Sequence, residues 1–361
     1  MTKLHVGVVG VGIGRQHIDA YHALSDQFEV VAVCDLDEAK GKETAEHYQI
    51  SRLFSDFTEF CHCDDLDVID LCTPSYLHFS QTKEALAAGK HVICEKPIAG
   101  SLQAVDELIA LERESGKRVM PIYQYRFGHG VQKLQFLREQ GLAEKTYLTT
   151  IETLWRRRAP YYSVPWRGKW DTEMGGALLT LAIHAHDILT YVLGPIKRVF
   201  ARTTTRVNPI ETEDCVSASL EMADGSLASL SVTTGSSQEI SRHRFCFSGF
   251  SAESHTAPYR NTSEPWIFTG DTPEMVEKID ETLKDFAPLP EGFTGQFFRF
   301  YEALRHDAAS PVTLHDARMS LELITALYSS SRTNQPVELP IGPNHPMYGG
   351  WLPSQHAAVS P

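Results

Sequence analysis

The chain has 361 residues, of which 42% are hydrophobic and 22% are charged, a balance typical of a globular protein with room for two domains. Its formal net charge of −13 disfavours nucleic acids and anionic membranes as partners, because both bind basic surfaces. No signal peptide and no membrane-spanning segment is expected from the hydropathy pattern.

Seven cysteines, an odd number, are spread along the chain, and four of them lie in or beside apolar runs. Buried cysteines of this kind behave as small hydrophobic residues, so we predict a reduced, cytoplasmic chain. The triplet Cys61-His62-Cys63 has residue types that bind metals, but no second Cys/His pair follows at a usable spacing. We therefore predict no metal site.

In the first third of the chain, short apolar runs alternate with stretches of helical pattern. The apolar runs, predicted as strands, are Leu4–Val9, Phe28–Cys34, Val68–Cys72, His91–Cys94 and Arg118–Tyr123. The first predicted helix ends near Leu24, and the others span Asp37–Tyr48, about His78–Ala88 and about Leu102–Ser115. This alternation implies βαβ units and a parallel sheet covered on both faces. We predict an α/β fold whose first domain, residues 1–123, is a doubly wound Rossmann sheet.

A glycine cluster follows the first predicted strand and opens the first helix. Its members are Gly10, Gly12, Ile13 and Gly14. Small residues let the backbone approach a pyrophosphate, and the start of a helix offers free N–H groups. The spacing G-x-G-x-G is one residue shorter than the usual dinucleotide pattern, and such a loop alone is a weak signal.

An acidic residue strengthens the prediction of a dinucleotide site. Asp35 ends the second predicted strand, 21 residues after Gly14. A carboxylate there accepts hydrogen bonds from the adenosine ribose and repels a 2′-phosphate. Because no arginine follows Asp35 directly, the sequence favours NAD over NADP.

The third and fourth strands also end in residues that suit a ligand site. Thr73-Pro74 ends the third, where Thr73 can face the nicotinamide, and His78 is either a cofactor contact or an ordinary residue of the next helix. Glu95, Lys96 and Pro97 end the fourth. A lysine near a positive nicotinamide should lose its proton readily and act as an acid–base group, although a surface lysine is the plainer interpretation.

The pattern changes after Tyr123, where strands follow one another without intervening helices. These are Leu148–Trp155, Lys197–Val207, Cys215–Met222, Ser226–Thr234 and His243–Gly249, with a hairpin turn at 223–225. Such a succession implies an antiparallel sheet, so we predict a second, α+β domain over residues 124–335. The Pro- and Gly-rich residues 336–361 are predicted to form an extended tail, in which Tyr348 and Trp351 suggest docking.

Taken together, these residues resemble the Gfo/Idh/MocA family of oxidoreductases from residue 4 to about residue 340. The resemblance rests on the glycine loop with His17, Asp35, Thr73-Pro74 with His78, Glu95-Lys96-Pro97, Arg126-Phe127, Trp166-Arg167, Gly175-Gly176 with His184 and Asp187, and Asp316-Ala317-Arg318 before a final helix. It implies a large, mostly antiparallel second sheet with helices on one face, which is often used for dimer contacts. A homodimer or homotetramer is the expected assembly.

The resemblance places a second group of site residues on a helix predicted from about Gly176 to Leu193. Thr180, His184 and Asp187 would share one face of that helix. His184 resembles the family's active-site histidine, but Thr180 stands where an aspartate is usual. Since threonine cannot stabilise an imidazolium by charge, we assign proton transfer mainly to Lys96. His184 is predicted to be a hydrogen-bonding orienter or a secondary acid–base group, and Thr180 to contact the substrate. His186 is predicted to be structural.

Further site residues are interpreted through the same resemblance, and the basic run 156–158 is interpreted from its charge. Trp166 and Arg167 would reach across the cofactor, and Gln124 would contact the nicotinamide or the substrate. Glu95 and Lys96 belong to the cofactor set as well. The basic run 156–158 suits either a phosphate-bearing substrate or, as the favoured interpretation, a solvated strand end.

The sequence thus predicts a dehydrogenase that transfers a hydride to NAD from a hydroxyl of a small-molecule sugar, for example an aldose such as apiose, or of a cyclitol. Two alternatives stay open. One is a redox-neutral glycosidase of the same family, and the other is a non-catalytic NAD-sensing regulator, which would not need Lys96.

Overall fold

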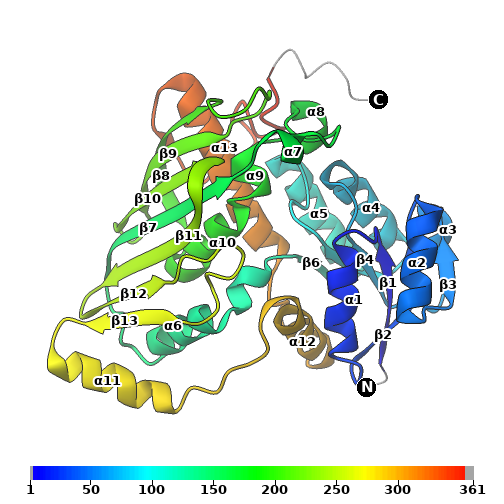
Figure 1. Ribbon diagram of the computed structural model, residues 1–361, viewed down its shortest axis with the longest axis horizontal. Helices are drawn as coiled ribbons and strands as arrows, with labels where there is room; N and C mark the ends of the chain where they lie inside the picture. Colours follow the sequence, from blue (N-terminus) through cyan, green and yellow to red (C-terminus); the bar gives the residue numbers. More distant parts are fainter. Residues whose placement is uncertain (1–2, 354–361) are drawn as a thin grey trace. The chain divides into compact units, whose positions relative to one another are not determined.

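The computed structural model describes residues 3–353, which divide into two compact units. The first unit runs to Tyr123 and includes Gly292–Arg318, and the second contains Gln124–Glu291 and continues from Met319 (Figure 1). The segment Gly292–Arg318, which the linear division from sequence assigns to the second domain, groups with the first unit. Its Phe297 ring stacks on Tyr21 at 4.4 Å between ring centroids, a contact that no local pattern announces.

The first unit is built on a six-stranded parallel sheet with the order β3-β2-β1-β4-β5-β6. Its strands are β1 (Leu4–Val9), β2 (Phe28–Cys34), β3 (Arg52–Phe54), β4 (Val68–Leu71), β5 (His91–Cys94) and β6 (Val119–Pro121). Both faces of the central strands are buried, which explains their continuous apolar runs. The doubly wound parallel sheet predicted from sequence is confirmed, and β3 is an addition to it.

The helices of this unit are α1 (Gly14–His22), α2 (Glu38–Tyr48), α3 (Phe57–Cys61), α4 (Ser75–Ala87), α5 (Leu102–Ser115) and α12 (Gly292–Arg305). Side chains of Asp37, Asp56 and Ser101 cap α2, α3 and α5 by accepting a backbone N–H. Helix α4 begins at Ser75, three residues earlier than predicted, and Pro74 is its N-cap residue.

The second unit is built on an eight-stranded sheet with the order β13-β12-β11-β7-β10-β9-β8-β14. Its strands are β7 (Thr146–Arg156), β8 (Ile196–Thr204), β9 (Cys215–Met222), β10 (Leu227–Thr233), β11 (Gly235–Phe247), β12 (Phe250–Ser254), β13 (Trp266–Gly270) and β14 (Val337–Glu338). All neighbours are antiparallel except β7 and β10. Gly225, at φ +84°, makes the β9–β10 hairpin turn, as predicted.

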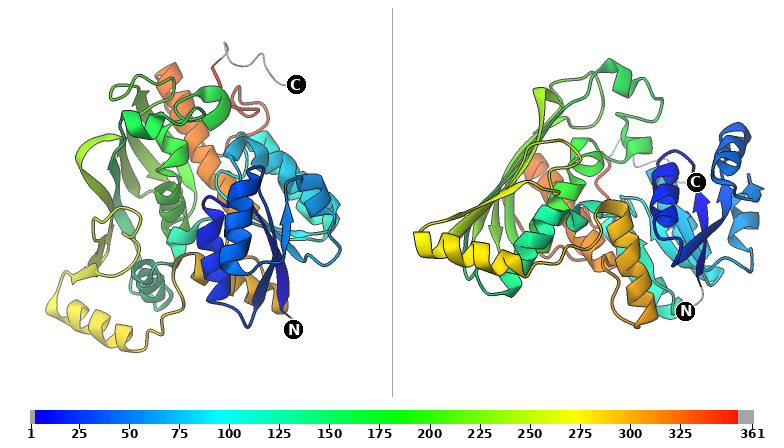
Figure 2. Two further views of the ribbon diagram at one scale, coloured as in Figure 1. Left: turned by 45° about the vertical axis from the view of Figure 1, so that its right-hand side comes forward. Right: turned by 60° about the horizontal axis from the view of Figure 1, so that its bottom comes forward.

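Helices line one face of this sheet, where Figure 2 shows the green α10 and the orange α13. The unit contains η1 (Gln124–Phe127), α6 (His129–Glu139), α7 (Ala159–Tyr162), α8 (Trp170–Glu173), α9 (Ala177–Thr180), α10 (Ile183–Leu193), α11 (Pro273–Lys284) and most of α13 (Leu314–Thr333). Asp316-Ala317-Arg318 lies inside the first turns of α13 and not before it. The Ser330 hydroxyl of α13 accepts the Ala201 N–H of β8 at 3.0 Å.

The helix predicted over 176–193 is broken in two. The Ala177 carbonyl accepts N–H groups from both Leu181, at 3.2 Å, and Ala182, at 2.9 Å, so the hydrogen-bond ladder slips by one residue before α10 begins. The prediction that Thr180 shares a helical face with His184 and Asp187 is therefore wrong. Only the latter two lie on α10.

The end of the described chain docks on the second unit. The indole N–H of Trp351 donates to the Met174 carbonyl at 2.6 Å, and the side chain is buried. This confirms the docking expected for Trp351. The extended tail predicted from residue 336 is wrong at its start, because Val337–Glu338 pair with β8 as β14 of the sheet, and positions 354–361 lie outside the described residues. Within residues 3–353, no single helix is long and apolar enough to cross a membrane. The bent pair Trp170–Thr180 and Ile183–Leu193 has the required length and composition only when its two segments are taken together.

A buried carboxylate holds the glycine pair that precedes α9. Glu213 accepts the N–H groups of Leu178 at 2.9 Å and Gly176 at 3.1 Å, and the Tyr328 hydroxyl at 2.7 Å. A Cβ at Gly176 would lie 2.0 Å from the Glu213 carbonyl oxygen, so only glycine fits there. Burial raises the pKa of Glu213 to about 7, although its hydrogen bonds oppose that shift.

This raised pKa predicts a stability that falls as pH rises. Glu213 holds its proton in the folded state up to about pH 7, whereas in the unfolded chain it releases it near 4.5. Its contribution is fully present below pH 4.5 and is lost as pH approaches and passes 7, by about 3 kcal/mol in total. Urea titrations between pH 5 and 8 should show a flatter profile for Glu213→Gln, while the exposed Glu211→Gln keeps the wild-type slope. An unchanged slope in Glu213→Gln would contradict the assignment.

Candidate active site

In the glycine loop after β1, the position that most clearly requires glycine is Gly10. Gly10 adopts φ +86°, and a Cβ there would lie 2.7 Å from the Cys72 carbonyl oxygen. Gly14 opens α1 against Val8, whereas Gly12 is exposed with nothing within 4 Å of a Cβ. Helix α1 has Ile13 as its N-cap and no side-chain cap, so its first N–H groups are available to an anion.

Asp35 fixes this loop to the end of β2. One carboxylate oxygen accepts the Val11 N–H at 2.8 Å, and the other accepts the Asp37 N–H at the same distance. Each oxygen keeps a further lone pair, which suits the hydroxyl groups of a ribose. The predicted position of Asp35, beside the glycines at one sheet edge, agrees with the structure.

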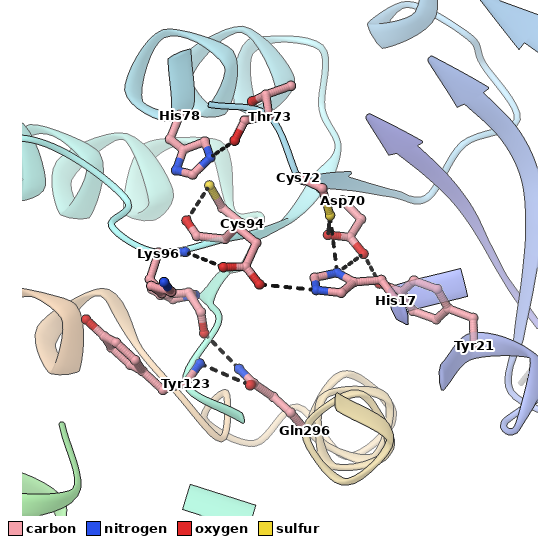
Figure 3. A network of polar contacts seen from close by, with 12 residues as sticks. His17, Tyr21, Asp70, Cys72, Thr73, His78, Cys94, Lys96, Tyr123 and Gln296 are labelled. Carbon is pink, nitrogen blue, oxygen red and sulfur yellow. Dashed lines mark hydrogen bonds and ion pairs between the residues drawn. The ribbon is translucent and has the colours of Figure 1, made fainter. Parts of the chain in front are cut away.

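Thr73, Pro74 and His78 close the end of β4. The Thr73 hydroxyl donates to the side-chain oxygen of Gln81 at 2.6 Å. The buried ring of His78 contacts the carbonyl oxygens of Pro97 at 2.7 Å and Thr73 at 2.8 Å. Both ring nitrogens thus face main-chain carbonyls, and His78 joins the chain after β4 to the chain after β5. Figure 3 shows its contact with Thr73.

Glu95 and Lys96 follow β5, next to β4 in the sheet. Glu95 is buried and its Oε2 accepts the Lys96 N–H at 3.1 Å, while Lys96 is half-buried. Because β1, β4 and β5 are adjacent parallel strands, the glycine loop, Thr73-Pro74 and Glu95-Lys96 stand in a row at one edge. The sequence-predicted residues of the first unit are therefore brought together.

Sequence reasoning missed a buried polar network behind that edge. The His17 ring contacts Asp70 Oδ2 at 2.9 Å through Nδ1 and Glu95 Oε1 at 3.3 Å through Nε2. Tyr21 donates its hydroxyl to Asp70 at 2.8 Å, and the Cys72 thiol lies 3.3 Å from His17. The available signal was Asp70 itself, a carboxylate inside a buried strand that must find donors.

Potential metal ligands gather at one place within residues 3–353. They are His17, Asp70 and Cys72, whose ligand atoms lie within 4.8 Å of one another. Their contacts with each other are those of a hydrogen-bonded cluster. In the Cys61-His62-Cys63 triplet, the His62 ring contacts the Thr58 carbonyl at 2.8 Å.

In the second unit, His184 is held by its neighbours on η1. Tyr125 stacks on the His184 ring at 4.4 Å between centroids and an interplanar angle of 16°. Arg126 forms two hydrogen bonds with Asp187, at 2.7 and 2.5 Å, and both side chains are buried. This ion pair fixes η1 to α10 and sets the ring of His184 against Tyr125. His186 is also buried, which lowers its pKa to about 3, consistent with a structural role.

Two other residues predicted to contact the substrate are Thr180 and Gln124. The Thr180 hydroxyl donates to the Gly176 carbonyl at 2.9 Å, and a hydroxyl oxygen that donates can also accept hydrogen bonds. The buried amide oxygen of Gln124 has no hydrogen-bond partner among the described residues. A buried acceptor of this kind suits a donor from a ligand.

Arg167 and the basic run are more enclosed than predicted. The Arg167 guanidinium lies over the rings of Tyr161, at 4.0 Å, and Trp166, at 4.3 Å, and pairs with Glu173 at 3.5 Å. Arg157 pairs with Glu239 at 2.5 Å and its side chain is 11% exposed. The solvated strand end predicted for 156–158 is therefore wrong for Arg157, whose charge is already matched by a carboxylate.

Comparisons with known proteins agree with this geometry. A D-glucoside 3-dehydrogenase of Escherichia coli is 26% identical, over 94% of this chain and 98% of its own. The WlbA dehydrogenase of Bordetella pertussis, solved with NADH and UDP-GlcNAcA, is 27% identical with a TM-score of 0.83, over 94% and 100%. A levoglucosan dehydrogenase solved with NADH and levoglucosan, at 20% identity and a TM-score of 0.80 over 94% and 100%, shares the fold.

Family profiles cover most of the two units. Residues 4–123 match the oxidoreductase family with an NAD-binding Rossmann fold, and residues 131–250 match the GFO/IDH/MocA C-terminal domain. The resemblance noted in the sequence is thereby confirmed. The chain is a member of the Gfo/Idh/MocA family, an oxidoreductase whose first unit is an NAD-binding Rossmann domain.

Proposed function

We propose that this enzyme oxidises a hydroxyl group of a monosaccharide or a cyclitol by hydride transfer to NAD. Lys96 accepts the hydroxyl proton, while His184 and Thr180 hydrogen-bond the same substrate oxygen. The observation that carries the proposal is the row formed by the glycine loop, Thr73-Pro74 and Glu95-Lys96 at one edge of an NAD-binding sheet. In such sheets ligands bind at the carboxyl ends of the strands.

Within this proposal, the first unit binds the dinucleotide. Gly10 and the start of α1 receive the pyrophosphate, and Asp35 accepts the ribose hydroxyls. NAD supplies the hydride acceptor, and the protein orients the substrate and moves the proton. Trp166 and Gln124 complete the cofactor and substrate contacts from the second unit.

The charges of the second unit support an uncharged substrate. Arg126, Arg157 and Arg167 pair with Asp187, Glu239 and Glu173 in turn. A phosphate or carboxylate on the substrate would have to compete with these existing partners. The names of relatives that act on D-glucosides, levoglucosan and inositols agree with a sugar or a cyclitol.

Replacing Lys96 tests the proton-transfer role. Lys96→Met should lower kcat by about 10²- to 10⁴-fold, the usual contribution of a positioned acid–base group. The measurement is NADH absorbance in a panel of monosaccharides, cyclitols and glycosides. Lys83→Met is the control and should keep wild-type turnover, because the half-buried Lys83 of the same unit pairs with Glu107 on α5.

Retained turnover in Lys96→Met would refute this proton acceptor. The panel also separates the alternatives. A redox-neutral glycosidase would consume a glycoside without releasing one NADH per product. A regulator would bind NAD and show no turnover with any compound.

Replacing Asp35 tests the NAD preference. Asp35→Asn removes the negative charge that opposes a 2′-phosphate while keeping an acceptor for the Val11 N–H. The KM for NAD should rise about tenfold or more, the loss expected for a hydrogen bond to a charged group, and the kcat/KM for NADP should rise. Asp37→Asn, two residues away, should leave the NAD/NADP ratio unchanged. An unchanged ratio in Asp35→Asn would contradict the ribose contact.

We further propose a homodimer or homotetramer that works in the reducing cytoplasm. Apolar side chains point outward from three strands of the second sheet: Phe200 from β8, Leu227 from β10 and Ile267 from β13. All seven cysteines are free, as a reducing compartment requires. Light scattering should give a mass of two or four times 40.4 kDa, and a monomer at micromolar concentration would refute the assembly.

A further inference from the structure

The ring of His17 stands between two carboxylates in the first unit. Its Nδ1 lies 2.9 Å from Asp70 Oδ2, and its Nε2 lies 3.3 Å from Glu95 Oε1 (Figure 3). The His17 and Asp70 side chains have no exposed surface, and that of Glu95 is 10% exposed. His17 thus connects α1 to β4 and to the turn after β5.

Other groups around the ring complete its environment. Asp70 also accepts the Tyr21 hydroxyl at 2.8 Å, and the Cys72 thiol lies 3.5 Å from its other oxygen. The rings of Phe293 and Phe297, from α12, lie 4.3 and 5.3 Å from the His17 ring centroid and exclude water. Among residues 3–353, the charged side chains that contact this ring are Asp70 and Glu95.

The geometry requires two donors from the imidazole. A carboxylate oxygen accepts a hydrogen bond, and a neutral imidazole carries only one N–H, so it would leave one carboxylate facing a lone pair. Burial lowers the pKa of His17, but the charge of Asp70 and the contacts with Asp70 and Cys72 outweigh it, and the net pKa lies well above 6.5. The ring is therefore an imidazolium at neutral pH.

The Glu95 carboxylate connects the His17 ring to the backbone of Lys96. While Oε1 faces His17, Oε2 accepts the Lys96 N–H at 3.1 Å, so the two contacts fix the orientation of the carboxylate. His78 holds the next peptide through the Pro97 carbonyl. The backbone on both sides of Lys96 is thereby tied to buried imidazoles.

We propose that His17 is a positioning residue for the oxidation, a buried imidazolium that orients Glu95 and, through Glu95, the backbone from which Lys96 reaches the substrate. This inference rests on the proposed function of Lys96. His17 touches neither cofactor nor substrate in this scheme. It also offsets one of two buried negative charges near the lysine.

The test compares His17→Gln with Cys72→Ala. Glutamine keeps a hydrogen-bond donor and removes the charge, while Cys72→Ala disturbs the same buried cluster and leaves the imidazolium in place. In His17→Gln, kcat should fall about tenfold or more, because misplacement of a catalytic group by a fraction of an ångström has such an effect. The alkaline-rising limb of the kcat profile should move to higher pH, since losing a positive charge makes Lys96 hold its proton more tightly.

The expected displacement of that limb is upward and on the order of one pH unit, because one nearby positive charge is removed. Cys72→Ala should keep the wild-type limb. A merely structural role would lower activity in both variants without moving either limb. An unmoved limb in folded His17→Gln overturns the proposal.

A second measurement needs no variant and no substrate. Neutron diffraction from wild-type crystals at pH 8 should show deuterium on both ring nitrogens of His17. Deuterium on only one nitrogen overturns the proposal, even where His17→Gln does not fold. Absence of turnover by the wild type with every sugar would refute the proposed function separately, since the protonation state is measured without it.

Discussion

The sheet edge that carries the candidate site of the first unit depends on hydrogen bonds to a carboxylate buried in the middle of the sheet. Asp70 lies on β4, a central strand, with no exposed surface. A buried charge of this kind is tolerated only with hydrogen-bond donors and a counter-charge. His17, Tyr21 and Cys72 provide them, and His17 then extends the same network to Glu95. The electrostatic requirement of one strand thus fixes the turn that carries Lys96.

The second unit uses buried charges in a comparable way. The Arg126–Asp187 pair fixes η1 to α10, and the Glu213 carboxylate holds the turn from which α9 begins. Between these two anchors the helix breaks, so Thr180 and His184 occupy separate segments. Removing one partner of such a buried pair leaves an uncompensated charge, which costs about 3–5 kcal/mol. In the second unit, a buried ion pair and a buried, hydrogen-bonded carboxyl group therefore hold the segments that carry the predicted substrate residues.

Much of this arrangement could be predicted from the sequence. Continuous apolar runs identified β1, β2, β4 and β5, because strands buried on both faces need no alternation, and the glycines with Asp35 marked the ligand edge. The short β3 and α3 carry too few residues for a periodic pattern. The break before α10 depends on one bifurcated carbonyl at Ala177, which residue types do not encode.

Contacts between residues far apart in the sequence were the other feature that could not be predicted. Nothing in the sequence around Glu213 indicates that its carboxyl group contacts Gly176 and Tyr328. The grouping of α12 with the first unit depends on Phe297 meeting Tyr21, 276 positions apart in sequence. By contrast, Asp70 in an otherwise apolar strand was a readable sign of a buried network. A charged residue within a predicted core strand indicates that hydrogen-bond partners for it lie elsewhere in the fold.

The central proposal is that Lys96 and His184 act on one hydroxyl group beside bound NAD. A crystal structure with NADH and a turned-over sugar measures this directly. The account predicts that Lys96 Nζ and a ring nitrogen of His184 both lie within about 3.2 Å of the same sugar oxygen, the limit for such hydrogen bonds. A sugar oxygen contacted by neither side chain, or by His184 alone with Lys96 turned away, would contradict it.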